Sequence, residues 1–590
     1  MRLALFAAVL LASVAVAQVP AAAPDDGAWV MPGRNHAGTR FSPLAQVTAA
    51  NAGQLKLAFS MPTGIHKGHE AATIVAEDTM FIVTPYPNAV IALDLTKPGA
   101  SVKWRFEAKP DPGSQGVACC DVVNRGAAYD KGRVFFNTLD NQAIALDAKT
   151  GRELWRAKLG EIKKGESMTM APLVVKDKVL VGNSGGEFGV RGWLKALDAA
   201  TGKVAWTAYS TGPDKDVLIG PNFKPFYPQD QGTDLGVKTW PADAWKIGGG
   251  TVWAWITYDA ALDLVFYGTA NPGPWNPAQR PGDNKWTSAL IARRPATGEA
   301  IWAYQKSPHD LHDFDGVNEA VVVELDWQGR NRKVLLHPDR NGYMYVMDPA
   351  TGQVLAAQPF VHITTSTAVD LRTGKLNYNP DKDPRPGEVT RDICPASPGA
   401  KDWQPTAWSP RTKLLYIPHQ NLCQDAVPGQ ASYIAGTPYV GMDIKMYPGP
   451  GGHRGLFTAW DPVAGKAAWQ VREHFPVWSG ALATAGDVVF YGTMDGWFKA
   501  LDAKTGQKLW EYKTESGIIG QPVSYRGPDG KQYIAVLAGV GGWAGAIVSG
   551  DMDPRDGTGA SGFAYAMRDL REATKKGGRL YVFSLEGPAK

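Results

Sequence analysis

A short pattern that recurs along the chain constrains its fold more than any other sequence feature. The pattern is a β-like run ending in Asp, then Thr-Gly, then Trp. Three clear copies have the turns Thr150-Gly151, Thr201-Gly202 and Thr505-Gly506, and they end at Trp155, Trp206 and Trp510. Self-similarity at a spacing of this kind is typical of β-propellers, in which each repeat is one blade of about four short strands.

Degenerate copies extend the series to seven. Three of them end at Trp104, Trp302 and Trp469, and another has the turn Thr351-Gly352 with Ala356 at the Trp position. Thr-Gly is common turn chemistry, so the pattern could be a series of unrelated turns. Unrelated turns, however, would not each be followed by an aromatic residue at the same position. We expect the Trp rings to pack between neighbouring blades, since large rigid aromatics bury much area there.

The eighth copy is divided between the two ends of the chain. Residues 580–585 resemble its strand, and residues 51–59 resemble its turn and aromatic position. A blade completed by both ends closes the ring and removes exposed sheet edges. The sequence therefore predicts an all-β, eight-bladed β-propeller with tryptophan-docking repeats, formed by one domain over residues 18–590.

The first 17 residues predict a secretory signal peptide. Arg2 precedes an apolar run that ends in Ala15-Val16-Ala17, and such a run is too short for a comfortable membrane span. We therefore expect the mature chain to have no membrane span and to function outside the cytoplasm. In a Gram-negative bacterium that compartment is the periplasm. The net charge of +4 is small for 590 residues and gives no indication of nucleic-acid binding. The absence of C-x-x-C-H excludes covalently attached haem. The sequence also contains no strand–GxGxxG–helix unit, which disfavours a nicotinamide-dependent dehydrogenase.

Unusual polar and aromatic side chains stand at two recurring places in the repeat. They precede first strands or follow second strands, and in an antiparallel four-stranded blade these two loops lie on one face. The residues before first strands are Glu70, Cys119, Cys120, Arg125, Thr169, Thr251, Trp253, Asp313, Asp315, Asp402, Trp403 and Trp478. Those after second strands are Ser184, Glu187, Asn271, Arg340 and Trp543. The strand phase thus predicts a site at one mouth of the central channel.

Two adjacent cysteines are the sharpest single signal in this set. Cys119 and Cys120 can be an accident or two halves of separate bridges, but Cys394 and Cys423 are the only other cysteines. Cys394 and Cys423 flank one hairpin and can pair in an oxidising compartment. That leaves Cys119 and Cys120 to form a strained ring disulfide, which is tolerated mainly where function supports it.

Five motifs resemble one enzyme family over about residues 33–585. They are Ala118-Cys-Cys-Asp-Val-Val-Asn-Arg125, Gly250-Thr-Val-Trp253, Gly268-Thr-Ala-Asn-Pro-Gly-Pro-Trp275, His337-Pro-Asp-Arg-Asn-Gly342 and Gly539-Val-Gly-Gly-Trp543. They look like the quinoprotein alcohol dehydrogenases that use pyrroloquinoline quinone (PQQ), and among these like the lanthanide-type methanol dehydrogenases.

The resemblance implies specific roles for the collected residues. The quinone would lie between the Cys119–Cys120 disulfide and the Trp253 ring, with Asp313 as catalytic base and Arg340 near the quinone carbonyl. Glu187 and Asn271 would be metal ligands together with Asp313. The remaining positions implied to contact or surround the quinone are Glu70, Arg125, Thr169, Ser184, Thr251, Asp402, Trp478 and Trp543.

Elementary chemistry agrees with these roles. A cation polarises a carbonyl as a Lewis acid, and oxygen ligands suit a hard metal. Asp315 stands two residues after Asp313, and in an extended segment both would face the same side. The extra charge favours a trivalent lanthanide over Ca²⁺, and Asp402 also resembles the lanthanide branch.

Three hypotheses follow. The first is a periplasmic enzyme that oxidises methanol or another small primary alcohol with PQQ and a lanthanide. The second is a calcium-dependent PQQ enzyme for longer alcohols, and the third is a propeller scaffold without activity. For an enzyme, the resemblance implies a separate cytochrome c as electron acceptor. The oligomeric state stays open, although family members are often homodimers.

Overall fold

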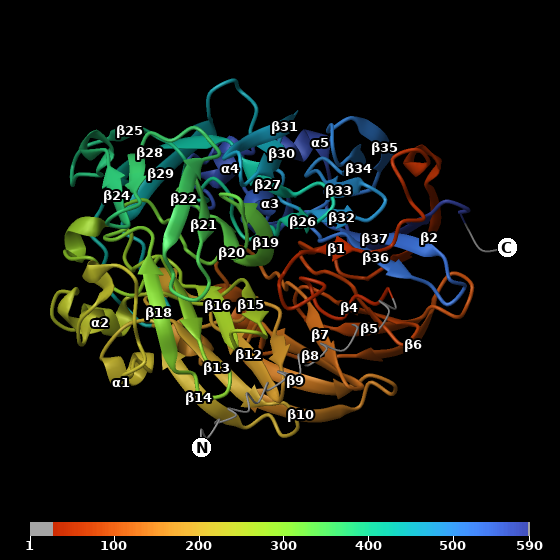
Figure 1. Ribbon diagram of the computed structural model, residues 1–590, viewed down its shortest axis with the longest axis horizontal. Coiled ribbons are helices and arrows are strands. Elements are labelled where there is room, and N and C mark those ends of the chain that lie inside the picture. Colours follow the sequence, from red (N-terminus) through yellow and green to blue (C-terminus); the bar gives the residue numbers. More distant parts are fainter. Residues whose placement is uncertain (1–26, 588–590) are drawn as a thin grey trace, which may run out of the picture.

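The chain folds as a ring of sheets around a central axis. The computed structural model describes residues 27–587, so the predicted signal peptide, residues 1–17, lies outside the described residues. Within that range, eight sheets of four or five strands follow one another around a disc, as the colours from red to blue in Figure 1 show. The predicted all-β, eight-bladed propeller is confirmed.

Each blade is antiparallel, and its first strand lies innermost. Blade 1 contains β3 (Ile74–Ala76), β4 (Thr79–Val83), β5 (Val90–Asp94) and β6 (Ser101–Phe106). Blade 2 contains β7 (Ala127–Asp130), β8 (Arg133–Thr138), β9 (Gln142–Asp147) and β10 (Glu153–Lys158). Blade 3 contains β11 (Leu173–Val175), β12 (Lys178–Gly182), β13 (Trp193–Asp198) and β14 (Val204–Tyr209). Blade 4 contains β15 (Ile256–Asp259), β16 (Leu264–Gly268), β17 (Ala289–Arg293) and β18 (Ala300–Gln305).

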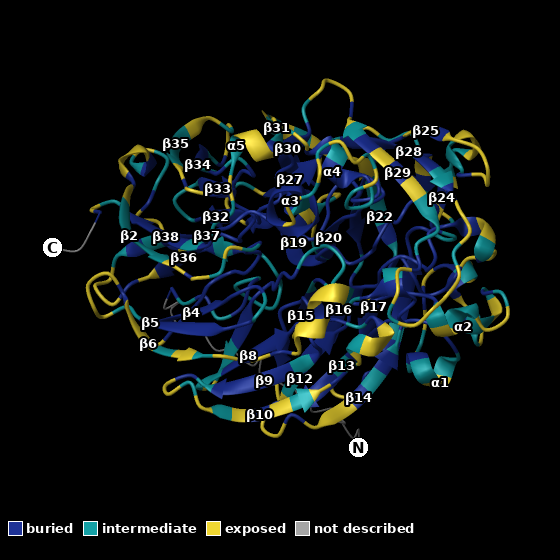
Figure 2. Cartoon of the chain, turned by 180° about the vertical axis from the view of Figure 1, so that it is seen from behind, coloured by how far each residue is buried: buried dark blue, intermediate teal, exposed yellow. Residues whose placement is uncertain are grey.

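The second half of the ring continues in the same order. Blade 5 contains β19 (Val321–Trp327), β20 (Arg330–Pro338), β21 (Tyr343–Met347) and β22 (Val354–Pro359). Blade 6 contains β26 (Ala407–Ser409), β27 (Leu414–Gln420), β30 (Gly455–Asp461) and β31 (Lys466–Glu473). Blade 7 contains β32 (Leu482–Thr484), β33 (Val488–Gly492), β34 (Trp497–Asp502) and β35 (Lys508–Lys513), with β1 (Phe41–Ser42) added parallel to β32. Inner strands are buried, and exposure is concentrated at the rim (Figure 2).

Blade 8 combines strands from both ends of the described chain. It contains β36 (Val523–Arg526), β37 (Gln532–Ala538) and β38 (Arg579–Ser584), and its outermost strand is β2 (Lys56–Pro62). β2 and β38 pair antiparallel, with Lys56 opposite Ser584 and Pro62 opposite Arg579. Because more than 500 residues of chain separate the paired strands in sequence, this pairing joins the start of the ring to its end.

The recurring sequence pattern builds the contact between one blade and the next. Asp198 Oδ1 accepts hydrogen bonds from the backbone N–H and the hydroxyl of Thr201, both 2.8 Å long, which fixes the turn. Gly202 then adopts φ +72°, and its Cα lies against the ring of Trp155 from the preceding blade. The Trp155 Nε1–H donates to Ala199 O at 3.0 Å. The same arrangement joins Trp104 to Gly151, Trp206 to Gly298, Trp302 to Gly352 and Trp469 to Gly506.

A segment before β2 contacts the innermost strand of every blade. Its backbone carbonyls or side chains make hydrogen bonds to Arg526, Val75, Tyr129, Val174, Tyr258, Val322, Trp408 and Ala483, one in each of blades 8, 1, 2, 3, 4, 5, 6 and 7. The Arg40 guanidinium within this segment is buried and donates to Ala481 O at 2.7 Å and Pro522 O at 2.6 Å. The segment thus holds all eight inner strands in one register around the axis.

Insertions between the strands add smaller elements. Short helices α1 (Asp214–Val217) and α2 (Leu235–Lys238) connect blades 3 and 4, and β23 (Ser366–Asp370) pairs with β24 (Lys375–Tyr378). A further sheet contains β25 (Thr390–Ile393), β28 (Leu422–Pro428) and β29 (Met442–Pro448), next to the Cys394–Cys423 disulfide. Helices α3 (Gly542–Ser549), α4 (Phe563–Ala566) and α5 (Leu570–Ala573) lie between β37 and β38. None of the described helices is long and apolar enough to cross a membrane.

The Trp–Gly contact between blades predicts a measurable difference between two glycine substitutions. Gly132 has φ +75° and open space around it, whereas a Cβ at Gly202 would lie 2.6 Å from a Trp155 ring atom. Gly132→Ala therefore adds only backbone strain of about 1–2 kcal/mol, and Gly202→Ala adds that strain plus overpacking of about 1–3 kcal/mol. We expect a lower midpoint of thermal unfolding for Gly202→Ala than for Gly132→Ala. Equal midpoints would contradict this account of the contact.

Candidate active site

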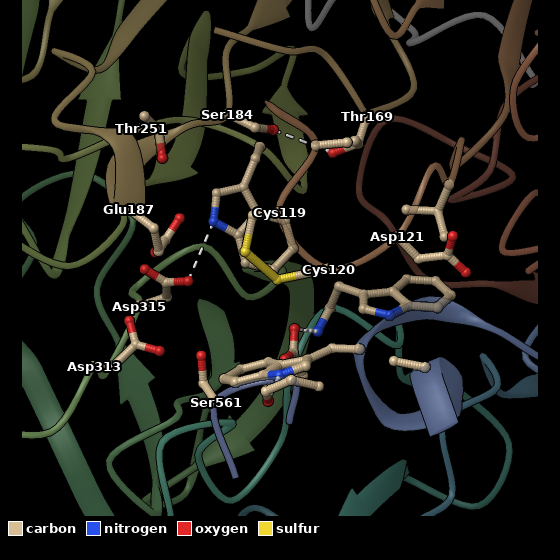
Figure 3. Close-up of a pocket in the computed structure, with 18 of the residues that line it drawn as sticks. Cys119, Cys120, Asp121, Thr169, Ser184, Glu187, Thr251, Asp313, Asp315 and Ser561 are labelled. Carbon is tan, nitrogen blue, oxygen red and sulfur yellow. Dashed lines mark hydrogen bonds between the residues drawn. A yellow bond between two sulfur atoms is a disulfide. The ribbon is translucent and has the colours of Figure 1, made fainter. Parts of the chain in front are cut away.

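The predicted site residues meet around one cavity at the mouth of the central channel. The cavity has a volume of about 270 Å³. All of the predicted residues except Asn271 line it, namely Glu70, Cys119, Cys120, Arg125, Thr169, Ser184, Glu187, Thr251, Trp253, Asp313, Asp315, Arg340, Asp402, Trp403, Trp478 and Trp543. Figure 3 shows carboxylates, hydroxyls and the disulfide directed into the same space. The loops before first strands and after second strands therefore do share one face.

The adjacent cysteines form part of the cavity wall. Cys119 and Cys120 are joined in a disulfide, and their Cα atoms are 3.8 Å apart. Cys120 and Asp121 both adopt left-handed backbone angles, with φ +70° and +79°. Such angles are uncommon outside glycine and tend to cluster at functional sites. Both cysteines are partly exposed, and their disulfide faces the cavity, as Figure 3 shows.

A buried ion pair and two tryptophans stand near the disulfide. Arg125 Nη2 lies 2.9 Å from Glu70 Oε2, and both side chains are almost fully buried. The guanidinium lies over the rings of Trp253 and Trp403, 4.7 Å and 5.1 Å from their centres. Arg125 also donates to the Thr169 hydroxyl at 2.6 Å. Its Nε–H is buried without a hydrogen-bond partner, and so is a donor left for a ligand.

Arg340 gathers three carboxylates on the other side of the cavity. Its Nη2 lies 3.1 Å from Asp315 Oδ2 and 3.0 Å from Asp402 Oδ2, and its Nη1 lies 3.5 Å from Asp313 Oδ2. All four side chains are almost fully buried. One positive charge therefore faces three acidic groups, with Glu187 close by as a fourth (Figure 3).

Asp315 is held in one orientation by several donors. The backbone N–H of Asn271 donates to its Oδ1 at 2.6 Å, and the Trp253 indole N–H donates to its Oδ2 at 3.2 Å. With Arg340 also bound to Oδ2, three of the roughly four acceptor positions of the carboxylate are occupied. The remaining position is available to a cation.

Asp313 and Asp315 converge for a different reason from the one the sequence suggested. We expected an extended segment, but Asp313 has φ +66°, in the left-handed region. The buried carboxylate of Asp310 accepts hydrogen bonds from the backbone N–H groups of Asp313 and Phe314, at 2.9 Å and 3.1 Å. This side-chain turn, and not strand alternation, brings both carboxylates toward Arg340.

Burial and like charges perturb the acidic groups. Burial, followed by the charge of Asp315, raises the pKa of Glu187 to about 7 and raises the pKa of Asp313 well above its ordinary value. Burial also raises the pKa of Asp315, although Arg340 opposes that shift. Burial would lower the pKa of Arg340, but Asp315, Asp402 and Asp313 together raise it. The raised pKa values show that the ionised carboxylates are uncompensated here, since one guanidinium faces four acidic groups.

The donors in this region fit a hard cation. Within residues 27–587, no three His, Cys, Asp or Glu side chains are grouped tightly enough to form a metal cage by themselves. However, Asn271 Oδ1 and Asp313 Oδ1 are buried oxygens without a hydrogen-bond partner. An uncompensated buried acceptor is costly, and oxygen ligands with excess negative charge suit a hard metal. Asn271 does not line the cavity itself, but its backbone N–H donates to Asp315, which does.

Several lining residues escaped the sequence reasoning. Asp121, Val123 and Trp275 lie inside or beside recognised motifs, and their proximity to Cys120 and Asn271 was the available signal. Ala546, Met552, Ala560 and Ser561 come from the insertion that contains α3, where no strand phase applies. The Trp543 indole N–H donates to Ala560 O at 2.7 Å, which fixes this insertion over the cavity.

Known proteins resemble the chain over almost its whole length. The family described as PQQ glucose/ethanol/alcohol dehydrogenase, beta-propeller domain, matches residues 29–369 and 458–534. The lanthanide-dependent methanol dehydrogenase of Methylacidiphilum fumariolicum is 50% identical over 95% of this chain and 93% of its own. The protein of the same name from Methylorubrum extorquens is 46% identical over 93% of each chain.

Solved structures give the same result. A europium-containing methanol dehydrogenase superposes with a TM-score of 0.94 at 49% identity, covering 95% of this chain and 98% of that one. A quinohemoprotein alcohol dehydrogenase from Pseudomonas putida superposes with a TM-score of 0.85 at 34% identity, covering 96% of this chain and 81% of that one. The fold, the matched family and these relatives agree, and the chain belongs to the PQQ-dependent alcohol dehydrogenase family.

Proposed function

We propose that this protein oxidises methanol or another small primary alcohol to the aldehyde, with PQQ as cofactor and a lanthanide ion as Lewis acid. The observation that carries the proposal is the group of three buried carboxylates around Arg340. One aspartate would be enough for the base and one for an ion pair with Arg340, so one aspartate remains. The acidic excess is suited to a strongly charged cation.

The cavity offers PQQ two faces and a set of polar contacts. We propose that the quinone lies between the Cys119–Cys120 disulfide and the Trp253 ring, since flat aromatic surfaces orient planar ligands. Arg125 would bind acidic or carbonyl oxygens of the quinone, because a guanidinium stays charged and donates in a fixed fork. Further contacts would come from Glu70, Thr169, Ser184, Thr251, Asp402, Trp478 and Trp543.

For the cation we propose Glu187, Asn271, Asp313 and Asp315 as ligands. When bound, the cation would supply Lewis-acid polarisation of a quinone carbonyl, and the quinone would be the oxidant that takes a hydride from the alcohol carbon. Asp315 is the residue that favours a trivalent ion over Ca²⁺, because it adds a full negative charge beside Asp313. Its three fixed donors keep that charge oriented toward the cavity.

Asp313 and Arg340 act on the substrate and cofactor from one side. We propose that Asp313 removes the hydroxyl proton of the alcohol as general base. Burial raises the pKa of Asp313 well above its ordinary value, and a cation bound beside it would favour the ionised form that a base needs. Arg340, held by three carboxylates, stays protonated and supplies positive charge at the quinone oxygens. The aromatic rings of Trp275, Trp478 and Trp543 exclude water and favour a small alcohol.

The setting of the reaction follows from the same proposal. Residues 1–17 would direct export and be removed, so that residues 18–590 form one domain in the periplasm. Two electrons must leave the reduced cofactor, and a separate cytochrome c is the proposed acceptor. The methanol dehydrogenase of Methylobacterium organophilum, 43% identical over 95% of this chain, has cytochrome c in its name. A homodimer is consistent with the proposal but not needed for it.

The experiment that tests the proposal is reconstitution with PQQ and either La³⁺ or Ca²⁺, followed by dye-linked activity over a series of primary alcohols. We expect quinone absorbance in the reconstituted protein and higher activity with La³⁺, decreasing as the alcohol lengthens. Preference for Ca²⁺ and longer alcohols would favour the second hypothesis. No quinone absorbance after reconstitution would favour the scaffold without activity.

Asp313→Asn separates the proposed base from the other roles. The amide keeps an oxygen for the cation and nearly the same shape, but it cannot take a proton. We expect kcat to fall by about 10²–10⁴-fold, the usual contribution of a general base, while PQQ absorbance is retained. A variant with unchanged kcat would contradict the assignment of Asp313.

Asp315→Ala tests the identity of the cation. Loss of this carboxylate should abolish lanthanide-dependent turnover. The expected decrease in turnover is larger than the roughly 10–100-fold decrease typical for a residue that only supports a metal ligand. Asp315→Asn is the matched control, since it keeps an acceptor for the Asn271 N–H but removes the charge; we expect it to lose La³⁺ activity as well. Undiminished turnover with La³⁺ in Asp315→Ala would rule out Asp315 as the deciding ligand.

A further inference from the structure

Two buried lysines lie next to the site without lining its cavity. Lys306 follows β18 and Lys401 precedes β26, and both side chains have no exposed surface. Each ammonium has one carboxylate partner, Asp339 for Lys306 and Glu319 for Lys401, and each pair is separated by 2.8 Å. Buried lysines are rare unless paired. The burial of these two ion pairs therefore needs an explanation, whereas a charged pair on the surface would not.

The contacts of Lys306 reach the loop that carries Asp313 and Asp315. Its Nζ donates to Gly316 O at 2.9 Å, one residue after Asp315, and to His337 Nε2 at 2.7 Å. With Asp339, all three ammonium protons have an acceptor. A Cβ at Gly316 would lie 2.7 Å from Lys306 Nζ. The loop therefore fits closely against this ammonium.

The contacts of Lys401 reach the third carboxylate in the same way. Its Nζ donates to Glu319 Oε2 at 2.8 Å and to Asp402 O at 3.2 Å. Glu319 Oε1 in turn accepts from the backbone N–H of Thr406 at 2.8 Å. The Asp402 backbone is thus fixed by Lys401, while its carboxylate contacts Arg340.

His337 joins the two lysine pairs. An ammonium only donates, so the Nε2 of His337 accepts from Lys306 and the proton of the neutral ring is on Nδ1. That Nδ1–H donates to Glu319 O at 3.1 Å. A series of buried hydrogen bonds therefore runs from Gly316 O through Lys306 and His337 to the backbone O of Glu319, and from the Glu319 carboxylate through Lys401 to Asp402 O.

We propose that Lys306, His337, Glu319 and Lys401 form a positioning network that sets the separation of Asp315 and Asp402, and thereby the affinity of the site for its cation. The inference rests on the proposed function. Both lysines are paired with a carboxylate, so the network contributes no net charge to the site and leaves its acidic excess in place. It acts on the backbone carbonyls of Gly316 and Asp402, and hydrogen bonds outside a metal site are known to orient its ligands and tune its affinity.

A double substitution tests this without leaving a buried charge unpaired. Lys306→Met with Asp339→Asn removes the ammonium and neutralises its partner, since a single substitution would cost about 3–5 kcal/mol in stability. The matched control is Lys285→Met with Asp230→Asn. Lys285 and Asp230 are also a buried pair, 2.5 Å apart, and Lys285 also donates to a carbonyl, Gln229 O at 2.7 Å. Neither residue lines the cavity.

The measurement is the equilibrium affinity of the PQQ-loaded protein for Tb³⁺, followed by luminescence, with the thermal unfolding midpoint of each variant. We expect the dissociation constant of the Lys306/Asp339 variant to rise about 10–100-fold, and that of the Lys285/Asp230 variant to equal that of the unsubstituted protein. We expect Lys401→Met with Glu319→Gln to resemble the Lys306/Asp339 variant.

The outcomes distinguish this inference from the proposed function. If the unsubstituted protein binds Tb³⁺ and the Lys306/Asp339 variant binds it equally well, the positioning role is wrong while the proposed function stands. An equal loss of affinity in the control also overturns the positioning role, because any buried pair would then suffice. No Tb³⁺ binding to the unsubstituted protein would overturn the proposed function, and this inference with it.

Discussion

The guanidinium of Arg340, shared by three buried carboxylates, is the interaction on which the site depends. Asp313, Asp315 and Asp402 each lie within 3.5 Å of it, and all three are almost fully buried. Taking several like charges out of water is costly unless cations and hydrogen bonds compensate them. One guanidinium only partly offsets this cost. The arrangement is therefore an unsatisfied one, and a bound cation of high charge is what would complete it.

The fold makes such a strained group of charges possible. Each blade is fixed to the next by a Trp ring lying against the glycine of the following turn, and the segment with Arg40 bonds to the innermost strand of every blade. Blade 8 joins both ends of the ring. The loops at the mouth of the channel therefore project from a closed and rigid scaffold. Strain and uncompensated charge persist only where the surrounding structure holds them.

Local repetition made much of this molecule predictable. The Asp-x-x-Thr-Gly turns and the phase of Trp155, Trp206 and Trp510 were sufficient for the blades, because each contact repeats at one spacing. The same phase predicted which loops share a face. Where the copy at Ala356 lacks its Trp, Gln358 lies against Gly465 instead, and such a substitution is not readable from the pattern.

Other features depend on contacts that no sequence period records. The turn that directs Asp313 comes from the side chain of Asp310, and an extended segment was the wrong expectation there. Ala560 and Ser561 reach the cavity from an insertion outside the repeat. Lys306 and Lys401 are far in sequence from their carboxylate partners Asp339 and Glu319, and an isolated lysine is normally read as a surface residue.

The most direct test of the central claim is anomalous X-ray diffraction from crystals of the protein grown with PQQ and a lanthanide salt. We expect one strong anomalous peak in the cavity, within bonding distance of oxygens from Glu187, Asn271, Asp313 and Asp315. A fully occupied cavity with no anomalous peak beside these residues, or a peak that Asp315 does not contact, would contradict it.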